Sequence, residues 1–148
     1  MKSNEYENKI EELEETFKEK LDRDSGSIRL DNQKIKDCVK SQMSLQLEWG
    51  QLQSDVSSIV RELDQILEYV FARIFDEKVN NRHKNVTTQE AKNAALSHED
   101  YVNYKIVYNR ALKLKTQVDS VVDTIRSRNY SVNKLCDLIV QGSEDHIV

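Results

Sequence analysis

The fold is decided by residues 35–73, which read IKDCVKSQMSLQLEWGQLQSDVSSIVRELDQILEYVFAR. Apolar side chains recur here in alternating steps of three and four residues, and ten of the twelve positions reached in this way are apolar. These twelve positions, which we call the seam, are Ile35, Cys38, Gln42, Leu45, Trp49, Leu52, Val56, Ile59, Leu63, Ile66, Val70 and Arg73. A heptad pattern of this length predicts one long helix, from about residue 31 to about residue 77, with a coiled-coil-like stripe on one face.

The composition permits long helices throughout the chain. The 148 residues include no proline and three glycines, the two residue types that most disfavour helix interiors. We therefore predict an all-α protein. No apolar run approaches the roughly 20 residues that span a bilayer, and the first twenty residues are too charged for a secretory signal, so we expect a cytoplasmic protein with no membrane association and with two reduced cysteines.

Capping signals divide the second half of the chain. Residues 78–87 are polar and basic and predict a loop, and the spacings Thr87 to Glu90 and Ser97 to Asp100 fit capping boxes. A helix is expected over about 88–128, followed by a turn at 128–130 and a short C-terminal helix over about 131–141. The seam of the 88–128 helix is predicted at Tyr101, Tyr104, Tyr108, Ala111, Lys115, Val118, Val122 and Ile125. The predicted architecture is a long helical hairpin, with residues 25–148 as its domain.

The first 24 residues predict a weak helical arm, which is either a marginal helix or an arm that docks on another part. They contain nine acidic and five basic residues, and their apolar stripe is thin. Residues 24–27, Asp-Ser-Gly-Ser, favour a linker between this arm and the hairpin.

Motifs for catalysis are missing from the sequence. There is no phosphate-binding lysine motif, no dinucleotide fingerprint and no nucleophile elbow. The three histidines do not stand at metal-ligand spacing with one another or with either cysteine. We therefore expect no enzyme activity, no catalytic residue, no metal and no cofactor.

Three features of the sequence have both a structural and a functional interpretation. The seam fits the core of a hairpin and self-association equally well. Tyr101, Tyr104 and Tyr108 share one helix face, which favours core packing over stacking on nucleic-acid bases. Arg73 interrupts the seam and should face solvent, an acid or a phosphate, and the basic residues Lys78, Arg82 and Lys84 follow it on a stretch that is either a phosphate-binding loop or a solvated polar loop.

Several short motifs, in the same order along the chain, resemble the UvsY-type phage recombination mediators. Residues 123–134, DTIRSRNYSVNK, resemble the C-terminal signature of that family. Further similarity lies in residues 96–100 before a tyrosine-rich helix, in Trp49 followed by Leu52, and in Ala72-Arg73-Ile74. The resemblance covers about residues 20–142.

The resemblance implies an all-helical protein that assembles as a ring-like, hexamer-like homo-oligomer with the C-terminal region in the assembly, for which Leu135, Leu138 and Ile139 are the candidates. It implies binding to single-stranded DNA and loading of a RecA-like recombinase onto DNA covered by single-strand binding protein, in the cytoplasm of a bacterial host. Arg73 matches the arginine of a basic DNA-contact motif, although Phe71 stands where that motif has a lysine.

The candidate DNA-binding residues are therefore Arg73, Lys78, Arg82 and Lys84, with Lys113, Arg126 and Arg128 as further basic positions. The alternative function, which the heptads and the net charge of −4 support equally, is a coiled-coil structural or adaptor protein with no nucleic-acid role.

Overall fold

The computed structural model describes residues 2–29, 34–80 and 86–141, and nearly all of them lie in four α-helices. These helices are α1 (Ser3–Arg29), α2 (Ile35–Asn80), α3 (Thr88–Ser97) and α4 (Glu99–Val140). The expected all-α fold is confirmed. Since a helix rises about 1.5 Å per residue, α2 with its 46 residues is roughly 70 Å long.

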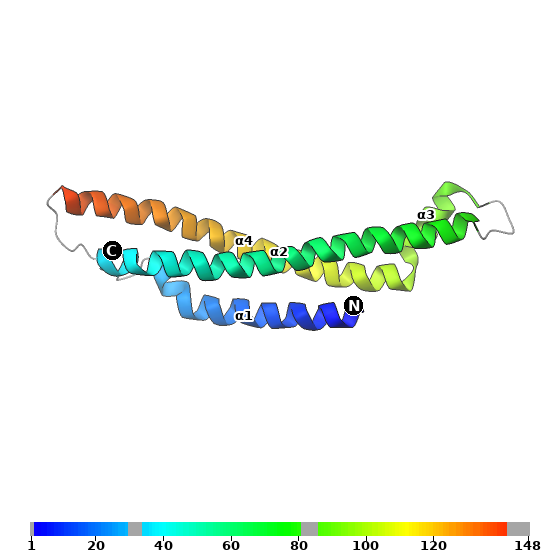
Figure 1. Ribbon diagram of the computed structural model, residues 1–148, viewed down its shortest axis with the longest axis horizontal. Helices are drawn as coiled ribbons and strands as arrows, with labels where there is room; N and C mark the ends of the chain where they lie inside the picture. The colour runs from blue at the N-terminus through cyan, green and yellow to red at the C-terminus, as the bar shows by residue number, and fades with distance from the viewer. Residues whose placement is uncertain (1, 30–33, 81–85, 142–148) are drawn as a thin grey trace.

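An elongated hairpin of α2 and α4 forms the body of the molecule (Figure 1). The two helices run antiparallel along most of their length. The first helix, α1, lies beside both of them over about half of the hairpin and runs antiparallel to α2, while α3 packs on α2 at the end where the hairpin turns. The chain is thus a three-helix bundle in its middle and a two-helix structure near its ends.

The apolar core consists of three clusters at different positions along this bundle. Trp49, Leu52 and Val56 of α2 meet Val118 and Ile125 of α4 in the first cluster, with Ile28 of α1 beside them. The second cluster contains Tyr6, Ile10, Leu63, Val107 and Ala111, and the third contains Val70, Ile74 and Ala95. No single centre holds the fold, so each part of the bundle depends mainly on its own cluster.

The predicted seam has the right register for most of α2 and the wrong one at its end. Seam residues from Cys38 to Leu63 are buried, apart from the half-buried Ile59, and the side chain of Ile35 lies outside the described part of the chain. Beyond Leu63 the buried residues include Leu67 and Ile74, whereas the predicted Ile66 is half-buried and Arg73 is exposed. A strict 3.5-residue repeat drifts by about 20° per heptad around a straight helix of 3.6 residues per turn, and that drift moves the buried stripe by one position.

The N-terminal segment is a docked helix, which agrees with the prediction of a helical arm that docks and corrects the prediction of a linker after it. Helix α1 continues through residues 24–27 as far as Arg29. Asp24 is buried and its Oδ2 accepts a hydrogen bond of 3.0 Å from the Trp49 indole N–H, and Ile28 is buried in the first cluster. These contacts keep Ser25 and Gly26 helical although both residue types favour turns, so the expected boundary at residue 24 falls inside a helix.

A second correction concerns the C-terminal region, where α4 continues without a turn to Val140. Arg128, expected in the turn, is only 3% exposed. Its guanidinium donates hydrogen bonds to the backbone oxygens of Ser27 (2.8 Å) and Cys38 (3.1 Å), to Ser41 Oγ (2.7 Å) and to Gln42 Oε1. Four acceptors on α1 and α2 therefore fix this turn of α4, and Val132 is buried one turn further on.

The boundaries around α3 agree with the sequence in part. Thr87 is the N-cap of α3, as predicted, and its hydroxyl accepts a hydrogen bond of 3.1 Å from the Glu90 N–H. Helix α4 is capped by His98 instead of Ser97, because the Ser97 hydroxyl bonds back to the Asn93 carbonyl oxygen. The predicted loop begins later than expected, since α2 includes Lys78 and ends at Asn80.

We expect Arg128→Ala to lower the free energy of unfolding by about 2–4 kcal/mol, because it removes four hydrogen bonds and leaves space in a buried site. Arg126→Ala is the matched control, two residues away and exposed, and should change that free energy by less than about 0.5 kcal/mol. Urea denaturation followed by circular dichroism measures both. Equal effects of the two substitutions would show that the buried hydrogen bonds contribute nothing to stability.

The Asp24 carboxylate should make folding sensitive to acid. Hydrogen bonds from Arg23, and also from Trp49, outweigh its burial and lower its pKa in the folded chain. A lowered pKa means that the carboxylate stabilises the fold above its ordinary pKa of about 3.9, and that this contribution is lost as the pH falls through the folded value. Asp24→Asn should therefore flatten the acid limb of a plot of melting temperature against pH below about pH 4. A limb as steep as that of the wild type would contradict this role.

Candidate nucleic-acid interface

The most basic helix of the described chain is α4. Residues 101–118 contain Lys105, Arg110, Lys113 and Lys115 and no acidic residue, and we call this stretch the basic segment. Helix α4 carries seven basic and five acidic side chains, whereas α1 carries five and nine, α2 five and eight, and α3 one of each. Of these four helices only α4 has a net positive charge, so a polyanion would be attracted to this helix first.

The four basic residues of this segment have different surroundings. The Lys105 ammonium lies 4.9 Å from the centre of the Tyr108 ring, and Lys115 Nζ lies 2.6 Å from Asp119 Oδ2. Arg110 faces three glutamates of α1. Lys113 is exposed and forms no ion pair with any residue that the structure describes, which makes it the most available cation of the segment.

The tyrosines of the segment are mainly core residues. Tyr101, Tyr104 and Tyr108 are all half-buried. Tyr101 packs edge-on against Phe71 with ring centres 6.2 Å apart, and Tyr104 and Tyr108 pack on the second cluster. This agrees with the interpretation of the triad as core packing.

Arg73 lies near the C-terminal end of α2. It lines a cavity of about 340 Å³ together with Tyr69, Val70, Asp100 and Tyr104. The guanidinium is exposed and donates a hydrogen bond of 3.0 Å to Asp100 Oδ2. Tyr69, with 68% of its surface exposed, stands beside it and was missed in the sequence because it lies outside the seam. Arg73 thus faces both solvent and an acid, as its place in the seam had suggested.

The basic loop predicted after Arg73 is only partly described. Lys78 is exposed on the last turn of α2, close in sequence to Asp76 and Glu77. Arg82 and Lys84 lie outside the residues that the structure describes.

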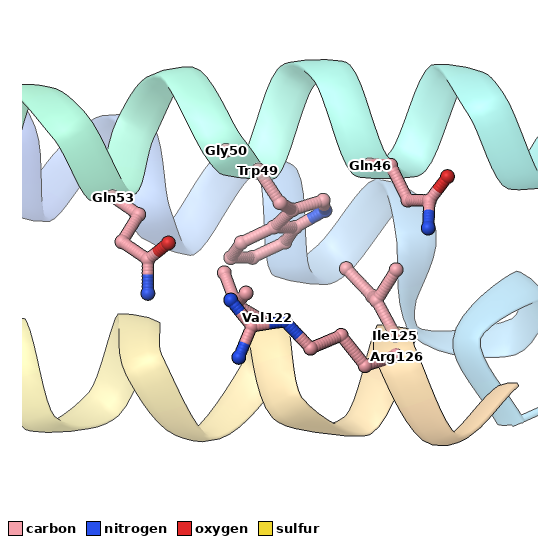
Figure 2. Close-up of a pocket in the computed structure, with 7 residues that line it drawn as sticks. All are labelled: Gln46, Trp49, Gly50, Gln53, Val122, Ile125 and Arg126. Atoms are coloured by element: carbon pink, nitrogen blue, oxygen red, sulfur yellow. The ribbon is translucent and has the colours of Figure 1, made fainter. Parts of the chain in front are cut away.

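The remaining candidates on α4 lie in different environments. Lys113 and Arg126 are exposed but stand thirteen residues apart, about 20 Å along the helix. Arg126 pairs with Asp123 at 3.2 Å and stands at the rim of a cavity above Trp49 (Figure 2). Arg128 is buried in the bundle and cannot reach a phosphate while the helices are packed, so we remove it from the candidate interface.

The cavity in Figure 2 lies between α2 and α4 and has a volume of about 190 Å³. Its lining comprises Gln46, Trp49, Gly50, Gln53, Val122, Ile125 and Arg126. Trp49, Val122 and Ile125 give it apolar lining, and two amides and one guanidinium give it polar lining, with no nucleophile and no acid–base pair among these residues. Among the residues with a described position, no group of three histidine, cysteine, aspartate or glutamate side chains could hold a metal ion.

Comparison of the chain with protein-family models, with curated proteins and with solved structures gives no match in any of the three. None of the helices in the described part of the chain has an apolar stretch that could cross a bilayer. Function must therefore be inferred from the surfaces of the helices.

The basic residues of the basic segment differ from those that were predicted to bind DNA. Of the seven predicted DNA-binding residues only Lys113 lies in the basic segment, and Lys105, Arg110 and Lys115 were missed. A signal for them was present, because no acidic residue occurs between Asp100 and Asp119.

Proposed function

We propose that this protein is a recombination mediator that binds single-stranded DNA along the basic segment of α4. It would help to load a RecA-like phage recombinase onto DNA covered by single-strand binding protein, in the cytoplasm of the bacterial host. The observation that supports the DNA contact is the run of four basic residues without an acid on the only helix of positive balance among those described. The recombination role rests on the sequence resemblance alone.

The mechanism in this proposal is positional. Contacts from Lys113 and its neighbours to phosphates would fix the strand without reading its sequence. A single copy offers few such contacts, so a homo-oligomer with repeated weak sites would supply the avidity. A strand held in this way remains exchangeable, which a mediator needs when one DNA-bound protein replaces another.

Self-association is supported by the apolar end of α4. Leu135 is half-buried, Leu138 and Ile139 are 42% and 39% exposed, and Val140 is 87% exposed. These residues follow the three-helix part of the bundle, where α1 no longer covers the hairpin. Burying them between copies would remove apolar surface from water, which is the main source of association free energy. A ring of hexamer-like size is part of the proposal.

An adaptor without a nucleic-acid role is the second candidate, and the charges of the described surface favour it. Arg73, Arg110, Lys115 and Arg126 each have an acidic partner in the chain. The exposed surface of α2 also contains the acids Glu62, Asp64, Glu68, Asp76 and Glu77. Such a molecule would repel a polyanion over much of its surface and could bind a helical partner through its apolar end.

DNA binding can be tested with the double variant Lys105→Ala/Lys113→Ala. Each phosphate neutralised on a single strand contributes about −0.7 to the slope of log affinity against log salt, so loss of two contacts should flatten that slope by roughly 1.4. Fluorescence anisotropy of a labelled oligo-dT over a salt series measures the slope. The matched control is Lys36→Ala/Lys40→Ala, which removes two exposed positive charges from the start of α2 and should leave the slope nearly unchanged.

Equal slopes for both double variants would remove the basic segment as the DNA site. No binding by any of the proteins at low salt would favour the adaptor.

Oligomerisation can be tested with Leu138→Ser/Ile139→Ser. We expect sedimentation to show a lower mass than for the wild type, because two exposed apolar side chains leave the proposed interface. Asn133→Ser/Asp137→Ser changes two exposed polar residues of the same part of α4 and should keep the wild-type mass. A wild-type chain that is monomeric at micromolar concentration would rule out the assembly.

A further inference from the structure

Helix α1 covers Arg110, the basic residue of the basic segment with the most acidic neighbours. Arg110 Nε lies 2.6 Å from Glu14 Oε1, and Arg110 Nη1 lies 3.6 Å from Glu11 Oε1 and 3.7 Å from Glu7 Oε1. We infer that residues 3–14 of α1, which we call the acidic strap, occupy a phosphate site at Arg110, so that the strap and a single-stranded polyanion compete for the same surface of α4. This inference rests on the proposed DNA-binding function and adds its regulation.

The glutamates of the strap imitate the charge of a phosphate backbone. Glu7, Glu11 and Glu14 are spaced by four and three residues and therefore line one face of α1, about one helical turn of 5.4 Å apart. They present a row of negative charges to α4, as a phosphodiester chain would. Arginine binds carboxylates and phosphates through the same planar set of donors, so one anion can replace the other.

The contact is electrostatically poor for the strap, and this makes it exchangeable. Three carboxylates face one guanidinium, and like charges one turn apart repel each other. The closest oxygen, Glu14 Oε1, is buried but accepts no hydrogen bond of good geometry from the described residues, so its contact with Arg110 is an ion pair without a well-directed hydrogen bond. Displacement of the strap would return the Glu14 carboxylate, the least exposed of the three, to water.

The two halves of α1 are held differently. The C-terminal half is fixed by the Asp24–Trp49 hydrogen bond, by the edge-on contact of Phe17 with Trp49, with ring centres 5.8 Å apart, and by the buried Ile28. The strap is held by the buried Tyr6 and Ile10 and by the hydrogen bond of 3.1 Å from the Tyr6 hydroxyl to Glu62. Leu13 also links the strap to the first cluster. Most of the contacts of the C-terminal half do not involve the strap, so the strap can separate from α4 while the rest of α1 stays docked.

Release of the strap would also uncover aromatic surface. Tyr6 and Ile10 belong to the same cluster as Tyr104 and Tyr108 of the basic segment. When the strap leaves, the faces of these two tyrosines become available to unpaired bases, and stacking on them offsets the apolar packing that the strap had provided. A strand would then gain both the Arg110 guanidinium and two stacking surfaces in a single exchange.

The experiment compares two triple variants that change the net charge by the same amount. Glu7→Gln/Glu11→Gln/Glu14→Gln removes the charges that face Arg110, and Glu12→Gln/Glu15→Gln/Glu19→Gln removes three exposed charges of α1 that form no ion pair with the described residues. Exposed ion pairs are individually weak, so we expect the first variant to bind labelled oligo-dT about 3- to 10-fold more tightly than the second. In an Arg110→Gln background the same three strap substitutions should give no such gain, because the glutamates act through that residue.

Each outcome decides between the proposals. Equal affinities of the two triple variants, with measurable binding by the wild type, overturn the strap and leave DNA binding intact. Binding by the strap variant alone supports the strap. Binding by none of the proteins at low salt overturns DNA binding and the strap together.

Hydrogen exchange supplies a readout that affinity does not. Addition of oligo-dT to the wild type should speed the exchange of backbone amides in residues 7–14 and leave residues 17–29 unchanged, because only the strap separates from α4. Slower or unchanged exchange in residues 7–14 with DNA bound overturns the competition. Circular dichroism of every variant controls for loss of helix.

Discussion

The burial of the Trp49 side chain between three helices is the interaction on which the docking of α1 and the central part of the bundle depend. Its indole is fully buried, its N–H has one acceptor in Asp24 of α1, and its ring packs on Phe17 and on the apolar side chains of α4. An indole in an apolar core needs a hydrogen-bond partner, and here α1 supplies it. The partner explains why α1 continues as a helix through Ser25 and Gly26, and why α1 belongs to the bundle despite its charge.

The periodicity of the sequence predicted the long helices, and it failed where a distant contact overrides a local preference. The turn expected near Asn129 is absent because Arg128 is bound by α1 and α2, which are about ninety to one hundred residues away in the chain. The same holds for the predicted linker, whose Asp24 finds its partner on α2. Local propensities of a few tenths of a kcal/mol per residue are smaller than the loss of a buried hydrogen bond, so tertiary contacts decide both places.

The candidate site was predicted less well than the fold, because a list of basic residues does not say which of them are already paired. Arg73 and Arg126 have acidic neighbours, and Arg128 is buried, although all three look alike in sequence. The more useful sequence signal is the absence of acidic residues between Asp100 and Asp119. This signal does not depend on which basic residues form ion pairs in the folded chain. It marks the stretch that holds Lys105, Arg110, Lys113 and Lys115, of which only Lys113 had been a candidate.

A core that is distributed along a rod has a consequence for motion. In a globular core, loosening one helix exposes the side chains that support all the others. Here the buried residues around Tyr6 and Ile10 form a different cluster from those around Trp49, although Val60 packs on both and Leu13 of α1 packs on the second of these. Separation of the N-terminal end of α1 therefore disrupts mainly the cluster around Tyr6 and Ile10. Local opening then costs only a part of the global free energy of unfolding, which places it among the motions that native proteins show. The elongated shape thus lets a surface be covered in one state and exposed in another without unfolding the molecule, as the proposed competition between the strap and a DNA strand requires.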